Sequence, residues 1–203
     1  MRIIALEVGP FFSNCYIVGP DNGNKGFVID AGAEPSDIMV AVKKLRLTIK
    51  YIVATHGHMD HVGAVAELKK ATNAAFTIHE DDASALSRRG FLFGGIGGNI
   101  QPDVLLHGDE TIEAGGLILK VIHTPGHSPG GICLLGDGVL FSGDTLFRRG
   151  IGRYDFPGAS GQQLIDSIRK RLFTLPDATV VYPGHGPQTT IGEEKLGNPF
   201  LEE

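Results

Sequence analysis

The chain has 203 residues, of which 42% are hydrophobic and 20% charged, and its formal net charge at pH 7 is −5. It has no apolar run near the roughly 18 residues that a membrane span needs, and no block of Lys and Arg typical of nucleic-acid-binding proteins. We therefore expect one globular domain over residues 1–203, with no membrane and no nucleic-acid partner.

The first thirty residues contain short apolar runs, bounded by Gly, Asn, Asp and Pro, which predict antiparallel strands. Glu7 and Pro10 interrupt the N-terminal run, so it lacks the apolar stretch of a signal peptide and we expect a cytoplasmic protein. Cys15 and Cys133 each lie inside an apolar strand-like run. This placement predicts two buried free thiols rather than a disulfide.

Helices and strands alternate along the rest of the chain. Helical spacing of apolar residues predicts helices at Pro35–Arg46, Gly63–Lys70 and about Gln162–Leu172. Strands are predicted at Ile3–Val8, Tyr16–Val18, Phe27–Ile29, Tyr51–Ala54, Phe76–Ile78, Leu117–Ile122, Ile132–Leu135, Val139–Phe141 and Thr179–Tyr182. The Gly-rich segment Arg88–Gly98 fits either an apolar lid or a packed surface loop. Together these elements predict an α/β (α+β) protein in which two mainly antiparallel sheets pack together, with helices outside.

Four metal-binding side chains fall within six residues directly after one predicted strand: His56, His58, Asp60 and His61. A loop that contains glycine can curl so that His56 and His58 face one ion while Asp60 and His61 face another. Neutral imidazole and carboxylate groups suit zinc, iron and manganese ions. The segment therefore predicts a metal centre rather than an ordinary polar loop.

Three further segments each place one candidate ligand in a glycine-rich turn at the end of a strand: His127, Asp144 and His185. Glycine at such a point lets the backbone approach an ion closely. Each segment alone is weak evidence, because a His or Asp at a strand end is more often a turn former. Together with the first cluster, the three segments complete two coordination shells.

The remaining histidines have other expected roles. His79 is expected to end a strand and His107 to lie in a loop, both as ordinary structural or surface residues. His123 lies four residues before His127, and we expect it at most to support a ligand from behind.

The motif His56-x-His58-x-Asp60-His61, followed by further ligands, resembles the metallo-β-lactamase-fold hydrolases over nearly the whole chain. The flanking runs are similar to those of the glyoxalase II branch, also called hydroxyacylglutathione hydrolases, in its short bacterial form without the C-terminal helical domain: Thr124–His127, Gly143–Phe147, Ile151–Gly158 and Gly184–Phe200. The resemblance implies a four-layer αββα metallo-β-lactamase sandwich with the metals at one edge.

The resemblance also implies how the ligands are divided: one ion is held by His56, His58 and His127, the second by Asp60, His61 and His185, and Asp144 bridges them. Two divalent ions would activate a bridging hydroxide; zinc is favoured, and iron or manganese accepts the same ligands. Asp60 would be the catalytic residue, orienting the hydroxide and handling its proton. The implied reaction is hydrolysis of a small anionic thioester such as S-lactoylglutathione.

Arg148, Arg149 and Arg153 form a cationic group in an acidic chain, and guanidinium groups suit carboxylates or phosphates. Pairing with Asp155 or Asp109 explains them equally well. In full-length glyoxalase II a basic residue at the position of Arg153 contacts glutathione, so the resemblance implies that Arg153 binds an anionic, glutathione-derived substrate.

Two other functions remain open. Persulfide dioxygenases have the same fold and a run similar to Gly152–Phe156, and in such an enzyme His56, His127 and Asp144 would hold a single iron. The other alternative is a degenerate metal-binding or scaffold protein without turnover. It is disfavoured because degeneration would be expected to erase some of the seven ligands.

Overall fold

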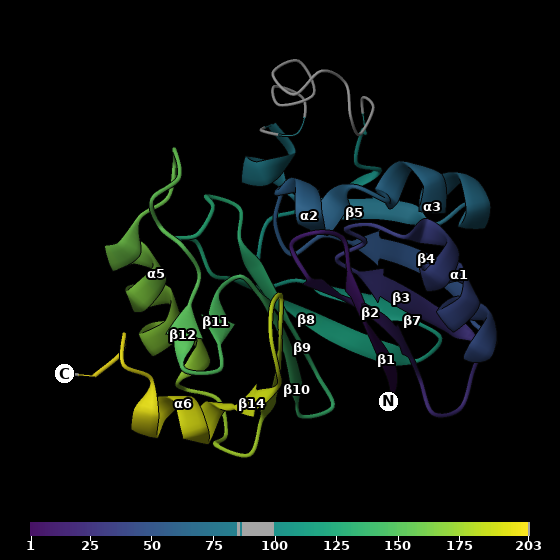
Figure 1. Ribbon diagram of the computed structural model, residues 1–203. Helices are drawn as coiled ribbons and strands as arrows, with labels where there is room; N and C mark the ends of the chain where they lie inside the picture. The colour runs from purple at the N-terminus through teal and green to yellow at the C-terminus, as the bar shows by residue number, and fades with distance from the viewer. Residues whose placement is uncertain (85, 87–99, 203) are drawn as a thin grey trace.

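The computed structural model describes residues 1–84, 86 and 100–202. Within these residues, two six-stranded sheets pack face to face, with helices on both outer sides (Figure 1). The first sheet contains, in order, β1 (Arg2–Val8), β2 (Ser13–Gly19), β3 (Lys25–Ile29), β4 (Thr48–Val53), β5 (Ala75–His79) and β6 (Val104–Leu106). The second contains, in order, β14 (Thr189–Thr190), β13 (Val180–Pro183), β10 (Val139–Gly143), β9 (Ile132–Gly136), β8 (Leu117–His123) and β7 (Thr111–Ala114). A hairpin of β11 (Leu146–Phe147) and β12 (Gly150–Ile151) follows β10.

Helices cover the outer face of each sheet. The first sheet carries α1 (Pro35–Lys44), α2 (Met59–Val62) and α3 (Val65–Thr72), and the second carries α5 (Gly161–Ser167), the π-helical turn η1 (Ile168–Leu172) and α6 (Ile191–Gly197). Pro35 begins α1 because its fixed φ suits the first helical position, where its missing N–H leaves no bond unmade. The buried side chains Ile38 and Val42 then face the sheet.

Three apolar layers hold the fold together. Ile38 and Leu68 pack with Ile52 and Phe76 between the helices and the first sheet. A second layer lies between the two sheets, and a third lies between the second sheet and α5, η1 and α6. The predicted four-layer αββα sandwich is therefore confirmed, and Cys15 and Cys133 are buried free thiols as expected.

The expectation of mainly antiparallel sheets is wrong for half of the first sheet. β3, β4, β5 and β6 pair in parallel, and so do β10 and β13. The physical reason is that α1, α3 and α5 carry the chain back across a sheet face, so that the next strand starts at the same edge as the last.

The short elements β6, β7, β11, β12, β14, α2 and α6 were not expected from the sequence. Several contain only two to four residues, too few for a periodic pattern to show. The segment Arg88–Gly98, expected as a lid or loop, lies outside the described residues. Among the described residues, no helix has the length and apolar character needed to cross a bilayer.

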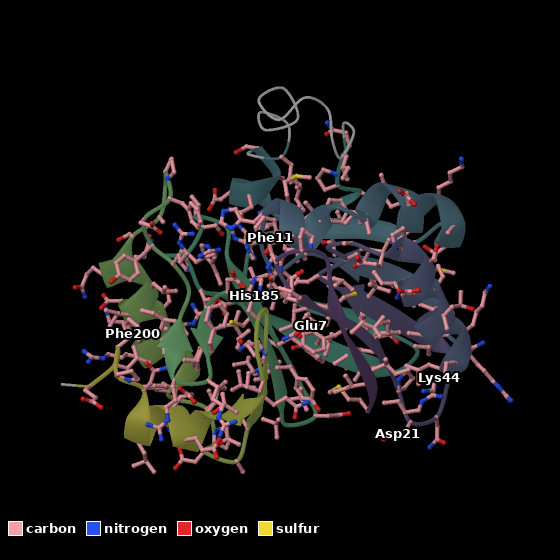
Figure 2. The ribbon with its side chains drawn as sticks, in the orientation of Figure 1. Glu7, Phe11, Asp21, Lys44, His185 and Phe200 are labelled. Carbon is pink, nitrogen blue, oxygen red and sulfur yellow. The ribbon has the colours of Figure 1, made fainter. Side chains whose placement is uncertain are left out.

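The directions of the strands determine where the loops meet. β4, β8, β10 and β13 all run toward the same edge of the sandwich, and the segments that follow them carry the candidate ligands. Figure 2 shows His185, which follows β13, between the elements of the first sheet and those of the second.

Candidate metal centre

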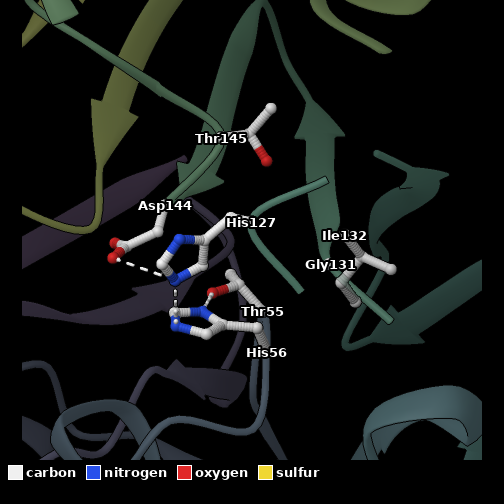
Figure 3. Close-up of a pocket in the computed structure, with 7 residues that line it drawn as sticks. All are labelled: Thr55, His56, His127, Gly131, Ile132, Asp144 and Thr145. Carbon is white, nitrogen blue, oxygen red and sulfur yellow. Dashed lines mark hydrogen bonds and ion pairs between the residues drawn. The ribbon is translucent and has the colours of Figure 1, made fainter. Parts of the chain in front are cut away.

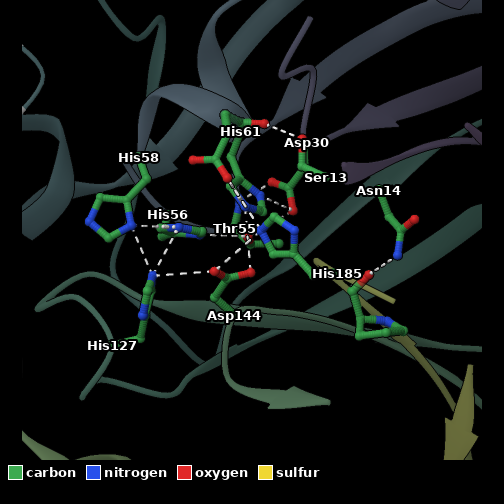
Figure 4. Close-up of polar contacts among 12 residues, drawn as sticks. Ser13, Asn14, Asp30, Thr55, His56, His58, His61, His127, Asp144 and His185 are labelled. Carbon is green, nitrogen blue, oxygen red and sulfur yellow. Dashed lines mark hydrogen bonds and ion pairs between the residues drawn. The ribbon is translucent and has the colours of Figure 1, made fainter. Parts of the chain in front are cut away.

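The structure brings all seven predicted ligands together at this edge. Figure 4 labels each of them except Asp60. Three imidazoles form what we call the first half of the centre: His56, His58 and His127. Three other residues form the second half: Asp60, His61 and His185. Asp144 lies between the two halves.

The first half has three imidazole nitrogens in mutual contact. His56 Nε2 lies 3.1 Å from His58 Nδ1, and His127 Nε2 lies 3.2 Å and 2.9 Å from these two atoms. The three rings are close to perpendicular, at 83° to 89°. Nitrogens bound to zinc at about 2.0 Å in a tetrahedron are roughly 3.3 Å apart. The first half is therefore shaped to surround one cation.

Backbone groups hold the first half in place. His127 Nδ1 lies 2.7 Å from the carbonyl oxygen of Arg153, which fixes the tautomer that leaves Nε2 free to bind a metal. Asp82 is buried, and its carboxylate accepts hydrogen bonds from the N–H groups of Gly57, at 2.8 Å, and Gly130, at 2.7 Å. Because Gly57 and Gly130 belong to the two loops that carry the three imidazoles, Asp82 links those loops.

The second half contains a carboxylate and two imidazoles. Asp60 Oδ2 lies 3.2 Å from His185 Nε2 and 3.6 Å from His61 Nε2. Asp60 and His61 lie on α2, a helical turn where the sequence predicted a loop. Asp30 Oδ2 lies 3.1 Å from His61 Nδ1, so it positions the ring from behind.

Asp30 and Asp82 contact the segments of the candidate centre, and the sequence analysis missed both. Asp30 is fully buried and accepts hydrogen bonds from the N–H of Thr55, at 2.7 Å, and from its hydroxyl, at 2.8 Å. Asp30 follows a buried strand directly, as Asp144 follows β10, and this signal could have found it. Asp82 lies beyond the end of β5 and carries no comparable signal.

Asp144 connects the two halves. Its Oδ1 lies 3.5 Å from His61 Nε2, and its Oδ2 lies 3.5 Å from His127 Nε2 and 3.7 Å from His185 Nε2. Gly184 packs directly against this carboxylate, and a Cβ there would overlap Asp144 Oδ1 and come within 2.9 Å of His61 Cε1. Only glycine fits at position 184 without displacing the ligands.

The two halves differ in charge. Burial lowers the pKa of His56 well below its usual value, and the neighbouring imidazoles lower it further, so His56 is neutral. Burial also works to lower the pKa of His61, but Asp30, Asp144 and Asp60 raise it to about 9. The hydrogen bond to Asp60 raises the pKa of His185. Burial opposes ionisation of Asp60, yet His185 and His61 lower its pKa to about 2.

The seven residues fit a pair of divalent cations. His61 Nε2 and Asp144 Oδ1 are buried 3.5 Å apart, and neither has a hydrogen-bond partner in the described part of the chain. Buried polar atoms without partners are costly, and a cation between them would satisfy both. A small pocket lined in part by His56, His127 and Asp144 adjoins this carboxylate (Figure 3).

Arg153 pairs with Asp155, one of the two partners that the sequence suggested. Its guanidinium makes two hydrogen bonds to the Asp155 carboxylate, at 2.9 Å and 2.8 Å. Asp109 pairs instead with Arg171. Arg153 still lies near the candidate metal centre. Its Cζ is 4.4 Å from the centroid of the Phe156 ring, and Phe156 packs against His58.

The remaining histidines lie outside the seven-residue cluster. His79 ends β5 as expected and is buried, and His107 is exposed and pairs with Glu80 at 2.9 Å. His123 stacks on His79, and its Nε2 lies 3.0 Å from the carbonyl oxygen of Pro129.

The sequence of this chain is similar to those of known metalloproteins. Residues 8–185 match the family model described as the metallo-beta-lactamase superfamily. The chain is 36% identical over 216 residues to hydroxyacylglutathione hydrolase GloC of Haemophilus influenzae, covering 99% of this chain and 98% of that protein.

Three solved structures are similar over nearly the whole chain. BLEG-1 B3 metallo-beta-lactamase is 33% identical with a TM-score of 0.92, covering 100% of both chains. TTHA1623 in a di-iron-bound form is 37% identical with a TM-score of 0.83, covering 98% of this chain and 100% of that one. ETHE1 from Myxococcus xanthus is 33% identical with a TM-score of 0.83, covering 98% and 84%.

Proposed function

Because this chain belongs to the metallo-beta-lactamase superfamily, whose members are generally hydrolytic metalloenzymes, we propose that it is a binuclear hydrolase that cleaves a small anionic thioester of the S-lactoylglutathione class. The observation that carries the proposal is that two complete sets of metal-binding groups lie side by side, joined by Asp144. The similarity to GloC supports the thioester as the substrate class.

The proposed ligands are His56, His58 and His127 for one ion and Asp60, His61 and His185 for the other, with Asp144 shared. Zinc is the proposed metal, and the di-iron form of TTHA1623 makes iron the metal to compare with it. When bound, two such ions would make a water molecule acidic and stabilise an oxyanion. The chain would then need no Ser or Cys nucleophile.

Asp60 is the proposed catalytic residue. With a pKa of about 2 it is ionised at neutral pH, so it accepts a hydrogen bond from the attacking water and orients it. The same low pKa makes Asp60 a weak base that does not keep the proton. Its side chain is 22% exposed, so the proton can pass on to solvent.

Arg153 is the proposed contact for the anionic end of the substrate. It is 67% exposed and stacked over Phe156 at the rim of the first half. An incoming carboxylate can replace Asp155 as its partner at little cost, because exposed ion pairs contribute only about 0–1 kcal/mol.

A persulfide dioxygenase with one iron is the second candidate function. The observation in its favour is the similarity to ETHE1, a persulfide dioxygenase. In that case His56, His127 and Asp144 would hold the iron, and Asp60 and His185 would not be needed for turnover.

The test is to measure metal content and two reactions on the purified protein: hydrolysis of S-lactoylglutathione and O2 uptake on glutathione persulfide. We expect close to two tightly bound metals per chain in the protein as purified, without added metal, and thioester cleavage. Asp60→Asn should remove most of this turnover, while the same change at the exposed Asp177, which pairs with Lys195, should not. One iron per chain with O2 uptake would establish the second candidate instead. Hydrolysis of a β-lactam is a further comparison, since BLEG-1 is a metallo-beta-lactamase.

A further inference from the structure

A second cluster of metal-binding groups lies apart from the seven residues above. His79 ends β5, His123 ends β8, and Asp81 belongs to the helical residues that follow β5. One donor atom of each lies within 4.8 Å of the donor atoms of the other two. The two imidazole rings are stacked, with centres 4.1 Å apart and planes inclined at 14°. His79 is only 2% exposed, so this pair is built into the protein rather than left on its surface.

The hydrogen bonds leave one basic nitrogen on each ring. His123 Nε2 lies 3.0 Å from the carbonyl oxygen of Pro129, which can only accept, so Nε2 carries the proton and Nδ1 of the neutral ring keeps its lone pair. The N–H of Asp81 donates to His79 Nδ1 at 3.3 Å, so this nitrogen is also unprotonated. The backbone carbonyl that fixes the tautomer of His123 is a contact typical of metal-binding histidines. At His79 an ion bound to Nδ1 would have to replace the 3.3 Å hydrogen bond from the Asp81 N–H.

His79 Nδ1 and the Asp81 carboxylate face each other without a proton between them. His79 Nδ1 lies 3.6 Å from Asp81 Oδ2, within the 2.9–3.7 Å that separates neighbouring donor atoms of the main centre. Burial and the neighbouring His123 lower the pKa of His79, which keeps the ring neutral. Two acceptors at this distance repel each other, and a cation between them turns the repulsion into attraction.

The stacking distinguishes this cluster from the main centre, where the rings are nearly perpendicular. Parallel rings direct their lone pairs side by side rather than at one point. The torsion at the Cβ–Cγ bond of histidine is broad, so the His123 ring, which is less buried than His79, can turn toward a cation. Because that turn strains the hydrogen bond from His123 Nε2 to the Pro129 carbonyl, we expect weaker binding here than in the main centre.

We propose that His79, Asp81 and His123 form a third metal site, which takes a divalent ion such as Zn²⁺ with three protein ligands and water in the remaining position. Its place in the fold gives it a structural effect. Asp82, the next residue after Asp81, is hydrogen-bonded to Gly57 and Gly130 in the loops of the first half. An ion bound by His79, Asp81 and His123 would restrict the motion of the segment that carries Asp82.

The test is a titration of the metal-free full chain with Zn²⁺ against a competing chelator. We expect three equivalents per chain, the third being the weakest. His123→Ala and Asp81→Asn should each bind two equivalents and keep the turnover of the wild type. His107→Ala is the matched control and should still bind three, because His107 is an exposed histidine paired with Glu80 outside the cluster.

Two results would overturn the proposal: a wild type that saturates at two equivalents, or a His123→Ala variant that still binds three. If His123→Ala loses turnover together with a tightly bound ion, His123 supports the main centre and the third site is wrong. The test does not depend on the proposed thioester activity, because it counts metal. Circular dichroism of His123→Ala and Asp81→Asn shows whether a lost equivalent reflects unfolding, and only folded variants are compared.

Discussion

The first half of the metal centre consists of three imidazoles, whereas the second half combines two imidazoles with the carboxylate of Asp60. The first half is neutral at His56 and is held by Asp82 and the Arg153 carbonyl, both through backbone groups. The second half is charged, since the pKa of His61 is raised to about 9, and it is held by the buried carboxylate of Asp30. The imidazoles of the first half are thus oriented by hydrogen bonds with backbone groups, whereas those of the second half are surrounded by carboxylates.

The largest expected effect comes from a change that disturbs both halves at once. Gly184→Ala puts a methyl group into Asp144 and against His61, so the shared carboxylate must move. We expect a loss of turnover of at least about 100-fold, because misplaced catalytic groups can cost that much, together with less than one metal per chain. Metal analysis and steady-state kinetics measure both.

Gly150→Ala is the matched control for this change. A Cβ at Gly150 meets its nearest atom, in Phe147, at an ordinary 3.6 Å. Full turnover in Gly184→Ala would mean that Asp144 need not lie where the structure puts it.

The next effect should separate the halves. Asp30→Asn weakens the support of His61 directly. It reaches the first half only through Thr55, whose hydroxyl lies 3.2 Å from His56 Nδ1, and it leaves the contact of His127 with the Arg153 carbonyl untouched. Loss of a residue that orients a metal ligand typically lowers metal affinity by about 10- to 100-fold. We expect the weaker ion to be lost and the ion of the first half to remain, as shown by competition with a chelator. Loss of both ions in equal measure would contradict the division into halves.

Asp82→Asn is the reciprocal experiment. An amide offers only one acceptor oxygen, so the N–H of either Gly57 or Gly130 loses its partner. We expect the affinity of the first half to fall about tenfold and the free energy of unfolding to fall by about 1–3 kcal/mol. Chelator competition and chemical denaturation measure these values. An unchanged first half would show that Asp82 only stabilises the fold.

The pH dependence of metal binding should also differ between the halves. His61 has a pKa of about 9 without metal, so it carries a proton at neutral pH that must leave before its nitrogen can bind an ion. Affinity at the second half should rise by up to about tenfold per pH unit and level off above pH 9. His56 is already neutral at pH 7, so affinity at the first half should change less. Metal titrations at several pH values measure how the affinity of each half changes with pH. Equal pH dependence at the two halves would contradict this prediction.

The smallest effect concerns the rim of the first half. Arg153→Ala should raise KM for an anionic thioester by about threefold to fivefold, the size expected for an exposed charge contact, and leave kcat unchanged. Asp155→Ala frees the guanidinium and should lower KM slightly. If kcat falls instead, the Arg153 side chain positions the segment whose carbonyl holds His127, rather than contacting the substrate.

Much of the fold could be predicted from the sequence because the signals are local. Alternating apolar residues and turn formers located the long strands, and Pro35 located the start of α1. The direction of pairing could not be predicted for β3 to β6, since parallel or antiparallel pairing depends on the face that the intervening helix crosses. Elements as short as β11 and β14 have no period to detect.

The candidate site divides in the same way. The spacing of His56, His58, Asp60 and His61 identified metal-binding chemistry, and strand ends identified the other three residues. Asp30 follows a strand directly, so its position could have been noticed. Its contact with His61, the links made by Asp82 and the stacking of His123 on His79 could not be predicted, because each depends on segments that meet only after the sheets have formed.

The sequence by itself therefore determined which seven residues form the candidate centre and that the segments carrying them follow strands, because residue type and turn chemistry are properties of neighbouring positions. Only the tertiary structure decided which lone pairs face one another, which histidines are neutral and which are charged. Those properties follow from burial and from the pairing of distant strands, and both are fixed by the packing of the two sheets.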